Sequence, residues 1–155
     1  EINRFTYEEG INAVSISPDG QTLMLGDWWG WVGFADASTG DIIVSYHAHT
    51  AQVSSLAVSP DGMYGLSASF DEKVILWDMA TMQQLRVYNN HTNWVWEAIF
   101  TPDSQRVASA GVDRTVQVWQ VDLDNLIADT CRRLFRDLTE EERARFGIDD
   151  DPTCR

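Results

Sequence analysis

The sequence predicts an all-β protein built from three copies of one unit of antiparallel strands, followed by a short α-helical tail. The dipeptide Pro-Asp begins at Pro18, Pro60 and Pro102, and these positions are 42 residues apart. The same step relates His49 to His91, Asp71 to Asp113 and Trp77 to Trp119. A fixed period of this size indicates stacked copies of one supersecondary unit, each of which buries its apolar faces against its neighbours.

The second repeat shows most clearly how one unit is built. A strand through Val53 and Val58 ends at the turn Ser59-Pro60-Asp61-Gly62, where proline presets φ and glycine accepts a positive φ. Three further strands follow, at 66–69, 74–77 and 84–88, separated by turns at Phe70-Asp71-Glu72 and Ala80-Thr81. The unbroken apolar run from Val74 to Trp77 predicts burial on both faces. Four short antiparallel strands of this kind form one blade of a β-propeller.

On these residues, the chain resembles the WD-repeat β-propeller family. The matching residues are His49, Ser59-Pro60-Asp61-Gly62, Asp71 and Trp77-Asp78 in the second repeat, and His91, Thr101-Pro102-Asp103-Ser104, Asp113 and Trp119-Gln120 in the third. In this family a His, a Ser or Thr, an Asp and a Trp form a buried hydrogen-bonded set in each blade. The resemblance therefore implies two structural sets: His49, Ser67, Asp71 and Trp77, and His91, Ser109, Asp113 and Trp119.

The first repeat departs from this pattern. Its equivalent positions hold Tyr7, Leu25, Trp29 and Ala35, so no member of the polar set is present. The turn Ser17-Pro18-Asp19-Gly20 remains, and we expect the blade to form. Packing by Trp28, Trp29, Trp31 and Phe34 is then expected to replace the polar set.

The register of the repeats also predicts the extent of the propeller. We expect complete blades at 11–46 and 53–88, a third blade that ends near Val121 without its fourth strand, and an outer strand of a preceding blade at 1–5. The expected division is a partial propeller at 1–121, with repeats at about 1–38, 39–80 and 81–121, and a helical C-terminal extension at 122–155. Propellers close with about 4–8 blades. The remaining blades are therefore expected from a larger parent protein or from another copy of the chain.

After Val121 the apolar residues recur at helical spacing, and Thr139-Glu140-Glu141-Glu142 has the form of a capping box. The tail resembles C-terminal extensions of multidomain bacterial WD-repeat proteins, on the residues Asn125-Leu126-Ile127, Cys131, Arg136-Asp137-Leu138-Thr139-Glu140-Glu141 and Pro152-Thr153-Cys154. That resemblance implies a bacterial protein of signalling type. Cys131 and Cys154 form a disulfide or remain two reduced thiols, and a reducing compartment favours the thiols.

Composition excludes several classes of partner. The net charge is −13, from 24 acidic and 11 basic residues, so nucleic acid and anionic membranes are repelled. No segment is apolar and long enough to span a bilayer, and we expect a cytoplasmic protein without a cofactor.

An enzymatic interpretation is weak. His49, Ser67 and Asp71 have the residue types of a hydrolase triad, but the set recurs one repeat later with a tryptophan partner in each copy. His47 and His49 have a spacing found in metal sites, yet His49 already belongs to the buried set, and Asp149-Asp150-Asp151 lacks the pattern of a calcium loop. We therefore expect no catalytic residue and no metal ligand.

The remaining hypotheses are a scaffold module that binds a peptide or protein, and a structural or autoinhibitory propeller that restrains an upstream effector or enzyme domain. In the WD-repeat family, contacts with partners cluster at set positions after the histidine and before the turn aspartate. The resemblance transfers these positions to Asn12, Trp28, Gln52, Ser54, Phe70, Trp94, Trp96 and Val112. Trp94 and Trp96 flank Val95, so strand alternation turns both away from the face on which Val95 packs. Beside them, Asp27 and Glu97 would favour a basic or polar-aromatic peptide. The alternative is that the tryptophans pack between blades, above all Trp29 and Trp31.

Overall fold

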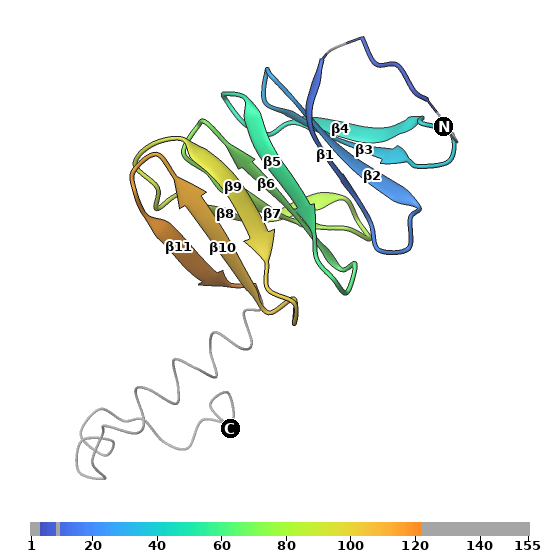
Figure 1. Ribbon diagram of the computed structural model, residues 1–155. Coiled ribbons are helices and arrows are strands. Elements are labelled where there is room, and N and C mark those ends of the chain that lie inside the picture. Colours follow the sequence, from blue (N-terminus) through green and yellow to red (C-terminus); the bar gives the residue numbers. More distant parts are fainter. Residues whose placement is uncertain (1–3, 9, 122–155) are drawn as a thin grey trace, which may run out of the picture. The chain divides into compact units, whose positions relative to one another are not determined.

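The computed structural model describes residues 4–8 and 10–121, and within these ranges it holds three antiparallel sheets (Figure 1). The first sheet contains β1 (Ile11–Ile16), β2 (Thr22–Asp27), β3 (Trp31–Asp36) and β4 (Ile42–His47). The second contains β5 (Val53–Val58), β6 (Tyr64–Ser69), β7 (Val74–Asp78) and β8 (Gln83–Tyr88), and the third contains β9 (Val95–Phe100), β10 (Arg106–Gly111) and β11 (Val116–Gln120). The prediction of two four-stranded blades and a third that ends after three strands is thus confirmed for the described residues.

Each sheet is a simple up-and-down meander, so every strand pairs with the next one along the chain. The turn between the first two strands is built alike in all three sheets. In the second sheet the Ser59 hydroxyl donates a hydrogen bond to Asp61 and accepts one from the Tyr64 N–H. Gly62 completes the turn at a φ of 76°, in the left-handed region that glycine adopts without strain.

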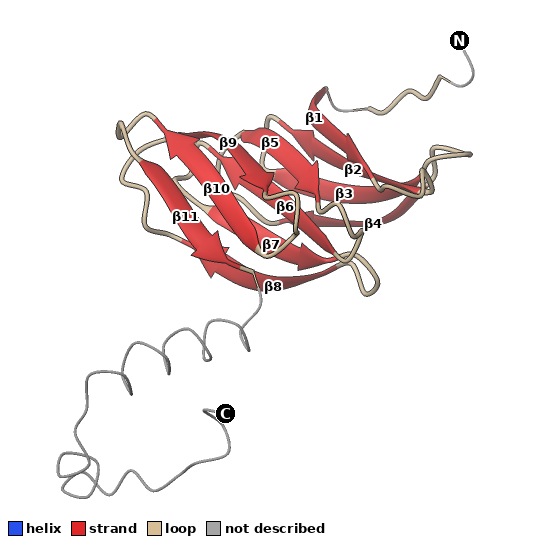
Figure 2. Ribbon diagram, turned by 60° about the horizontal axis from the view of Figure 1, so that its bottom comes forward, coloured by secondary structure: helices blue, strands red, loops and turns tan. Residues whose placement is uncertain are grey.

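The sheets stack through their faces, with β5 beside β1 and β9 (Figure 2). The central contact is an apolar core between the first two sheets. It is made by Met24, Val32 and Phe34 from the first sheet and by Val53, Ile75, Trp77 and Met79 from the second repeat. The strand β7 is buried along almost its whole length, as its unbroken apolar sequence predicts.

An aromatic pair repeats along the stack. Tyr46, at the end of β4, stacks on Trp77 of the next sheet with ring centroids 5.6 Å apart. Tyr88, in the equivalent position of β8, stacks on Trp119 of the third sheet at 4.7 Å. Each outer strand therefore contributes a tyrosine to the contact between neighbouring blades.

The sequence also predicts an outer strand before the first blade, a helical tail and no membrane-spanning segment. Residues 4–8 form no strand, so the described residues of the expected outer strand at 1–5, residues 4 and 5, do not belong to one; residues 1–3 lie outside the described part. The helical tail at 122–155, with Cys131 and Cys154, lies wholly outside the described residues. In the described part of the chain there is no helix suited to crossing a membrane.

The packing of the first blade differs from the expectation. Phe34 is fully buried, as expected, but Trp28, Trp29 and Trp31 are exposed. They lie on or next to the turn between β2 and β3, where side chains project beyond the end of the sheet, and so they do not fill the interior. The interior is filled instead by Met24, Val32 and Phe34 against the second sheet.

Candidate interaction surface

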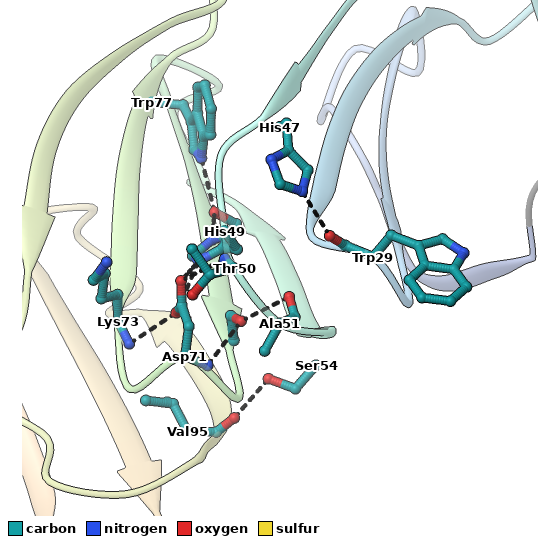
Figure 3. Close-up of polar contacts among 12 residues, drawn as sticks. Trp29, His47, His49, Thr50, Ala51, Ser54, Asp71, Lys73, Trp77 and Val95 are labelled. Carbon is teal, nitrogen blue, oxygen red and sulfur yellow. Dashed lines mark hydrogen bonds and ion pairs between the residues drawn. The ribbon is translucent and has the colours of Figure 1, made fainter.

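The second repeat contains all four members of the expected polar set in direct contact (Figure 3). The Nδ1 atom of His49 lies 3.0 Å from Asp71 Oδ1, and the Nε2 atom lies 2.8 Å from Ser67 Oγ. The Trp77 indole N–H donates to the same serine oxygen at 3.0 Å. Strands β6 and β7 supply the serine and the tryptophan, while the histidine comes from the segment that leads into β5.

One arrangement of hydrogens satisfies every group in this set. An ionised carboxylate accepts only, so His49 Nδ1–H donates to Asp71, and His49 Nε2 then accepts from the Ser67 hydroxyl. Ser67 has an oxygen lone pair left for the Trp77 indole N–H. Ser67 is fully buried, and its oxygen is used inside the blade, so it has neither the access nor the free base of a hydrolytic nucleophile.

Hydrogen bonds stabilise the ionised form of the two turn aspartates. Burial alone would raise the pKa of Asp71, but the hydrogen bond from His49, with the N–H groups of Thr50 and Lys73, lowers it below the ordinary value. Desolvation also opposes ionisation of Asp113. Hydrogen bonds from the Thr115 N–H, His91 and the Thr115 hydroxyl outweigh it and hold the pKa of Asp113 far below its usual range.

The third repeat forms the same set without its tryptophan hydrogen bond. His91 contacts Asp113 at 2.7 Å and Ser109 at 2.7 Å. Among the described residues, however, no hydrogen bond joins Trp119 to Ser109, and the indole packs on Tyr88 and edge-on to His91. The different packing of the two tryptophans explains this difference. Strand β7 pairs on both sides, and Trp77 is covered by both Phe34 and Tyr46. Strand β11 pairs only with β10 among the described strands.

The first repeat stabilises the corresponding turn with a single carboxylate. Asp27 Oδ1 accepts the backbone N–H groups of Trp29 and Trp31, at 2.8 and 2.9 Å. Asp27 occupies the position of Ser69 in the second repeat, where the serine oxygen likewise accepts from the residue two positions later. The residue that replaces the histidine, Tyr7, donates its hydroxyl to the Gly40 carbonyl at 3.1 Å. Asp27 is thus a buried structural group and no part of an exposed acidic fringe.

Three of the expected contact residues form an aromatic cluster that joins the second and third blades. Phe70 stacks on Trp94 with ring centroids 4.8 Å apart, and its ring meets Trp96 edge-on at 5.0 Å. Trp94 is 48% exposed and Trp96 is 54% exposed, as expected for side chains that point away from the face on which Val95 packs. Val112, which is also exposed, donates its N–H to the Trp94 carbonyl. We call Phe70, Trp94, Trp96 and Val112 the aromatic patch.

The backbone holds this patch in place. The Phe70 N–H donates to the Gln52 carbonyl at 3.0 Å, and the Val112 N–H donates to the Trp94 carbonyl at 2.8 Å. These are the same bond one repeat apart, and each ties a turn to the segment leading into the inner strand of its own blade. The aromatic rings are therefore carried by fixed backbone and need little ordering when a partner binds.

Two expected contact residues have a different role. Asn12 donates its amide to the Val53 carbonyl, and Ser54 donates its hydroxyl to the Val95 carbonyl, both at 2.6 Å. Each bond joins the inner strand of one blade to the next, and Figure 3 shows the second of them. We therefore assign Asn12 and Ser54 to the contact between blades and leave them out of the patch. The expected position Gln52 is half-buried and contributes its carbonyl.

The tryptophans of the first blade stand apart from the patch. Trp28 is well exposed, but within the described part of the chain it makes no ring contact with Phe70, Trp94 or Trp96. Trp31 packs against the His47 ring, and His47 Nε2 bonds to the Trp29 carbonyl (Figure 3). His47 and His49 thus point to different partners, and the described residues contain no group of three potential metal ligands.

Comparisons with known proteins agree with this architecture. The sequence model described as WD domain, G-beta repeat, matches residues 40–78 and 82–120. The fold is similar to the structure of U3-55K, with a TM-score of 0.71, and to the WD40 repeats of RRP9, with a TM-score of 0.70. Identity is 20% in both cases over 76% of this chain, which spans 38% and 37% of those two chains. No curated protein matches the sequence significantly.

Stacked four-stranded meanders with a buried histidine, serine and aspartate define this protein as a β-propeller of repeated blades. More narrowly, the chain belongs to the WD40 repeat family. Propellers of this family generally serve as non-catalytic scaffolds for interactions between proteins.

Proposed function

We propose that this protein is a binding module that captures a peptide or protein segment on the aromatic patch. The observation that carries the proposal is the aromatic cluster across two blades, in which the exposed rings of Trp94 and Trp96 pack on the half-buried Phe70. Tryptophan is the residue most enriched at interface hot spots, because it brings large contact area and an N–H donor at little entropic cost.

The chemistry around the patch supports a basic or polar-aromatic peptide as the occupant. Glu97 follows Trp96 directly and is exposed. At the equivalent turn positions, Glu72 is exposed two residues after Phe70 and Arg114 two residues after Val112, so the acidic bias rests on Glu97 and on the net charge. The whole chain carries a net charge of −13, which steers basic partners toward it and repels acidic ones.

The test is capture of a partner from cells by the full-length protein. Trp94→Ala and Trp96→Ala should each weaken capture at least tenfold, while Trp29→Ala should leave it unchanged. Trp29 is the matched control because it is an exposed tryptophan on the first blade, outside the patch. Partner binding that survives both patch substitutions would contradict the proposal.

We further propose that this module acts within a larger bacterial protein of signalling type, where further blades or a second copy cover the open sheet faces. Support comes from the outer face of the third sheet, where Ile99, Val116 and Val118 are exposed. Monomeric proteins seldom expose such apolar groups together. Sequencing of the gene upstream of Glu1 tests the larger-protein context, and absence of further WD repeats there would leave a second copy as the occupant.

A further inference from the structure

A cleft between the outer strands of the first two sheets has no part in the function proposed above. Its volume is about 500 Å³, within the range of pockets that hold a small molecule or a large side chain. Strands β4 and β8 are the outermost strands of their sheets, and the cleft is lined by Tyr46, His47, Ala48, Trp77, Gln83 and Gln84. Both sheets that form the cleft belong to the described chain, so a further blade stacked at either end does not cover it.

The splay of the two sheets opens this cleft. The inner strands β1 and β5 pack closely, whereas β4 and β8 make no comparable contact among the described strands. Tyr46 bridges the gap by stacking on Trp77, with ring centroids 5.6 Å apart. Beside this pair, Ala48 has only a methyl group, and the strand pairing places Gln84 opposite Trp77. The two rings therefore form an aromatic wall with open space next to it.

The polar groups that border the cleft are available to a ligand. Within the part of the chain that the structure describes, neither the Tyr46 hydroxyl nor the side-chain amides of Gln83 and Gln84 make a hydrogen bond. His47 Nε2–H donates to the Trp29 carbonyl, so the uncharged ring presents Nδ1 as an acceptor. A ligand in the cleft can therefore both donate and accept hydrogen bonds.

The cleft also lacks charge. Among the described residues that line it, none is an aspartate, glutamate, lysine or arginine. A charged group that enters would lose hydration without gaining an ionic partner, which is costly. An anion is opposed further by the net charge of −13. These properties select a neutral ligand.

A tyrosine side chain fits this chemistry. Its ring can pack against the wall formed by Tyr46 and Trp77, and its hydroxyl both donates and accepts. Phenylalanine would leave the amides unpaired, and tryptophan only donates. Because His47, Gln83 and Gln84 are exposed, the cleft is open to a side chain from another molecule. We propose that this cleft binds a tyrosine side chain of a protein partner, at a site separate from the aromatic patch.

The proposal is tested by titration of the ¹⁵N-labelled full chain with N-acetyl-tyrosine N-methylamide, followed by backbone amide NMR. Titrations use the Val118→Lys background, which limits self-association through the third sheet. Saturable shifts are expected at the amides of Tyr46, Ala48 and Gln84. N-acetyl-phenylalanine N-methylamide, which lacks only the hydroxyl, should bind about fivefold more weakly. The phosphotyrosine analogue, which adds negative charge, should bind about tenfold more weakly or less.

Substitutions at exposed positions locate the site. Gln83→Ala combined with Gln84→Ala removes both amides and should weaken the tyrosine probe about tenfold, with little change for the phenylalanine probe. Gln21→Ala combined with Gln105→Ala is the matched control and should have no effect, because these glutamines are exposed in turns outside the cleft. Trp94→Ala should also leave binding of the tyrosine probe unchanged, since Trp94 belongs to the aromatic patch.

Several results would overturn the proposal. Equal affinity for the tyrosine and phenylalanine probes would show that the hydroxyl plays no part. Equal affinity for the phosphotyrosine probe would show that the site does not exclude charge. Undiminished binding to the Gln83→Ala, Gln84→Ala variant would place the site elsewhere, and loss of binding in Trp94→Ala would assign the probe to the aromatic patch. Absence of saturable binding to the titrated chain also refutes the site. The patch is tested by capture of a partner, so either site can fail alone.

Discussion

Ser67 is the residue on which the hydrogen-bonded set of the second blade depends, because it contacts both His49 Nε2 and the Trp77 indole. Ser67→Ala leaves two buried groups without a partner. Each such group costs about 1–3 kcal/mol, so we expect a loss of about 2–6 kcal/mol in the free energy of unfolding. Chemical denaturation of the purified chain measures it.

The third blade offers a matched comparison. Ser109 bonds to His91, and among the described residues no hydrogen bond joins it to Trp119. Ser109→Ala should therefore cost less, about 1–3 kcal/mol, because only one buried group loses its partner. Equal losses for the two serines would show that the Trp77 indole contributes nothing to the set.

Ionisation of Asp71 links the same set to pH. Its pKa is lowered from an ordinary value of 3.8, so the folded state binds its proton more weakly than the unfolded state does. The stabilisation is full above the unfolded pKa and is lost as pH falls through 3.8 toward the lower folded value. We expect Asp71→Asn to be less stable than the parent at pH 7, with a difference that narrows between pH 5 and pH 2. A difference independent of pH would refute this linkage.

At the scale of the strands and turns, the space around a glycine distinguishes two positions that share a positive φ. Gly20 and Gly30 both have a positive φ, at 72° and 91°. A Cβ on Gly20 would meet nothing within 4 Å, whereas a Cβ on Gly30 would lie 2.2 Å from the His49 carbonyl oxygen. The Gly30 carbonyl also accepts the N–H groups of Ala48 and His49, so this turn joins the first sheet to the segment leading into the second.

We expect Gly20→Ala to cost about 1–2 kcal/mol, from the left-handed backbone alone. Gly30→Ala should cost about 2–5 kcal/mol, because overpacking against the backbone of His49 adds about 1–3 kcal/mol. Thermal unfolding of the two variants under one set of conditions compares them. A similar melting temperature for both would contradict the close approach at Gly30.

The sequence predicts strands and turns correctly where the same residues recur in successive repeats. The 42-residue period relates the Pro-Asp turns and the histidine–aspartate contacts, and the strands follow from them. The role of Asp27 was not predictable in this way, since it stands where the second repeat has Ser69 and does not fit the four-residue pattern. The sequence also does not predict that Tyr46 stacks on Trp77, because this contact depends on how one sheet is staggered against the next. The repeat positions of Asn12 and Ser54 predict contacts with a partner, because the sequence does not show that each side chain binds a carbonyl of the next blade.

For the whole molecule, the stacking of blades creates a binding surface that no single blade has. The aromatic patch takes Phe70 from the second blade and Trp94, Trp96 and Val112 from the third. The same stacking leaves one face of the first sheet and one face of the third without a neighbour among the described strands, and these are the faces that we propose further blades or a second copy to cover. Substitutions in the patch therefore test partner binding, whereas substitutions on an open face test association.

The open face of the third sheet leads to the last prediction. Val118 is 60% exposed on β11, and among the described strands β11 pairs only with β10. An unpaired edge with exposed valines favours association, which a lysine at that edge opposes. We expect the purified chain to scatter light as a species larger than its 17.5 kDa mass, and Val118→Lys to shift it toward the monomer. Met63→Lys is the control, because Met63 is also 60% exposed but lies in the turn between β5 and β6, away from the open sheet faces. A compact 17.5 kDa monomer in the parent chain, or equal effects of the two lysines, would contradict association through this face.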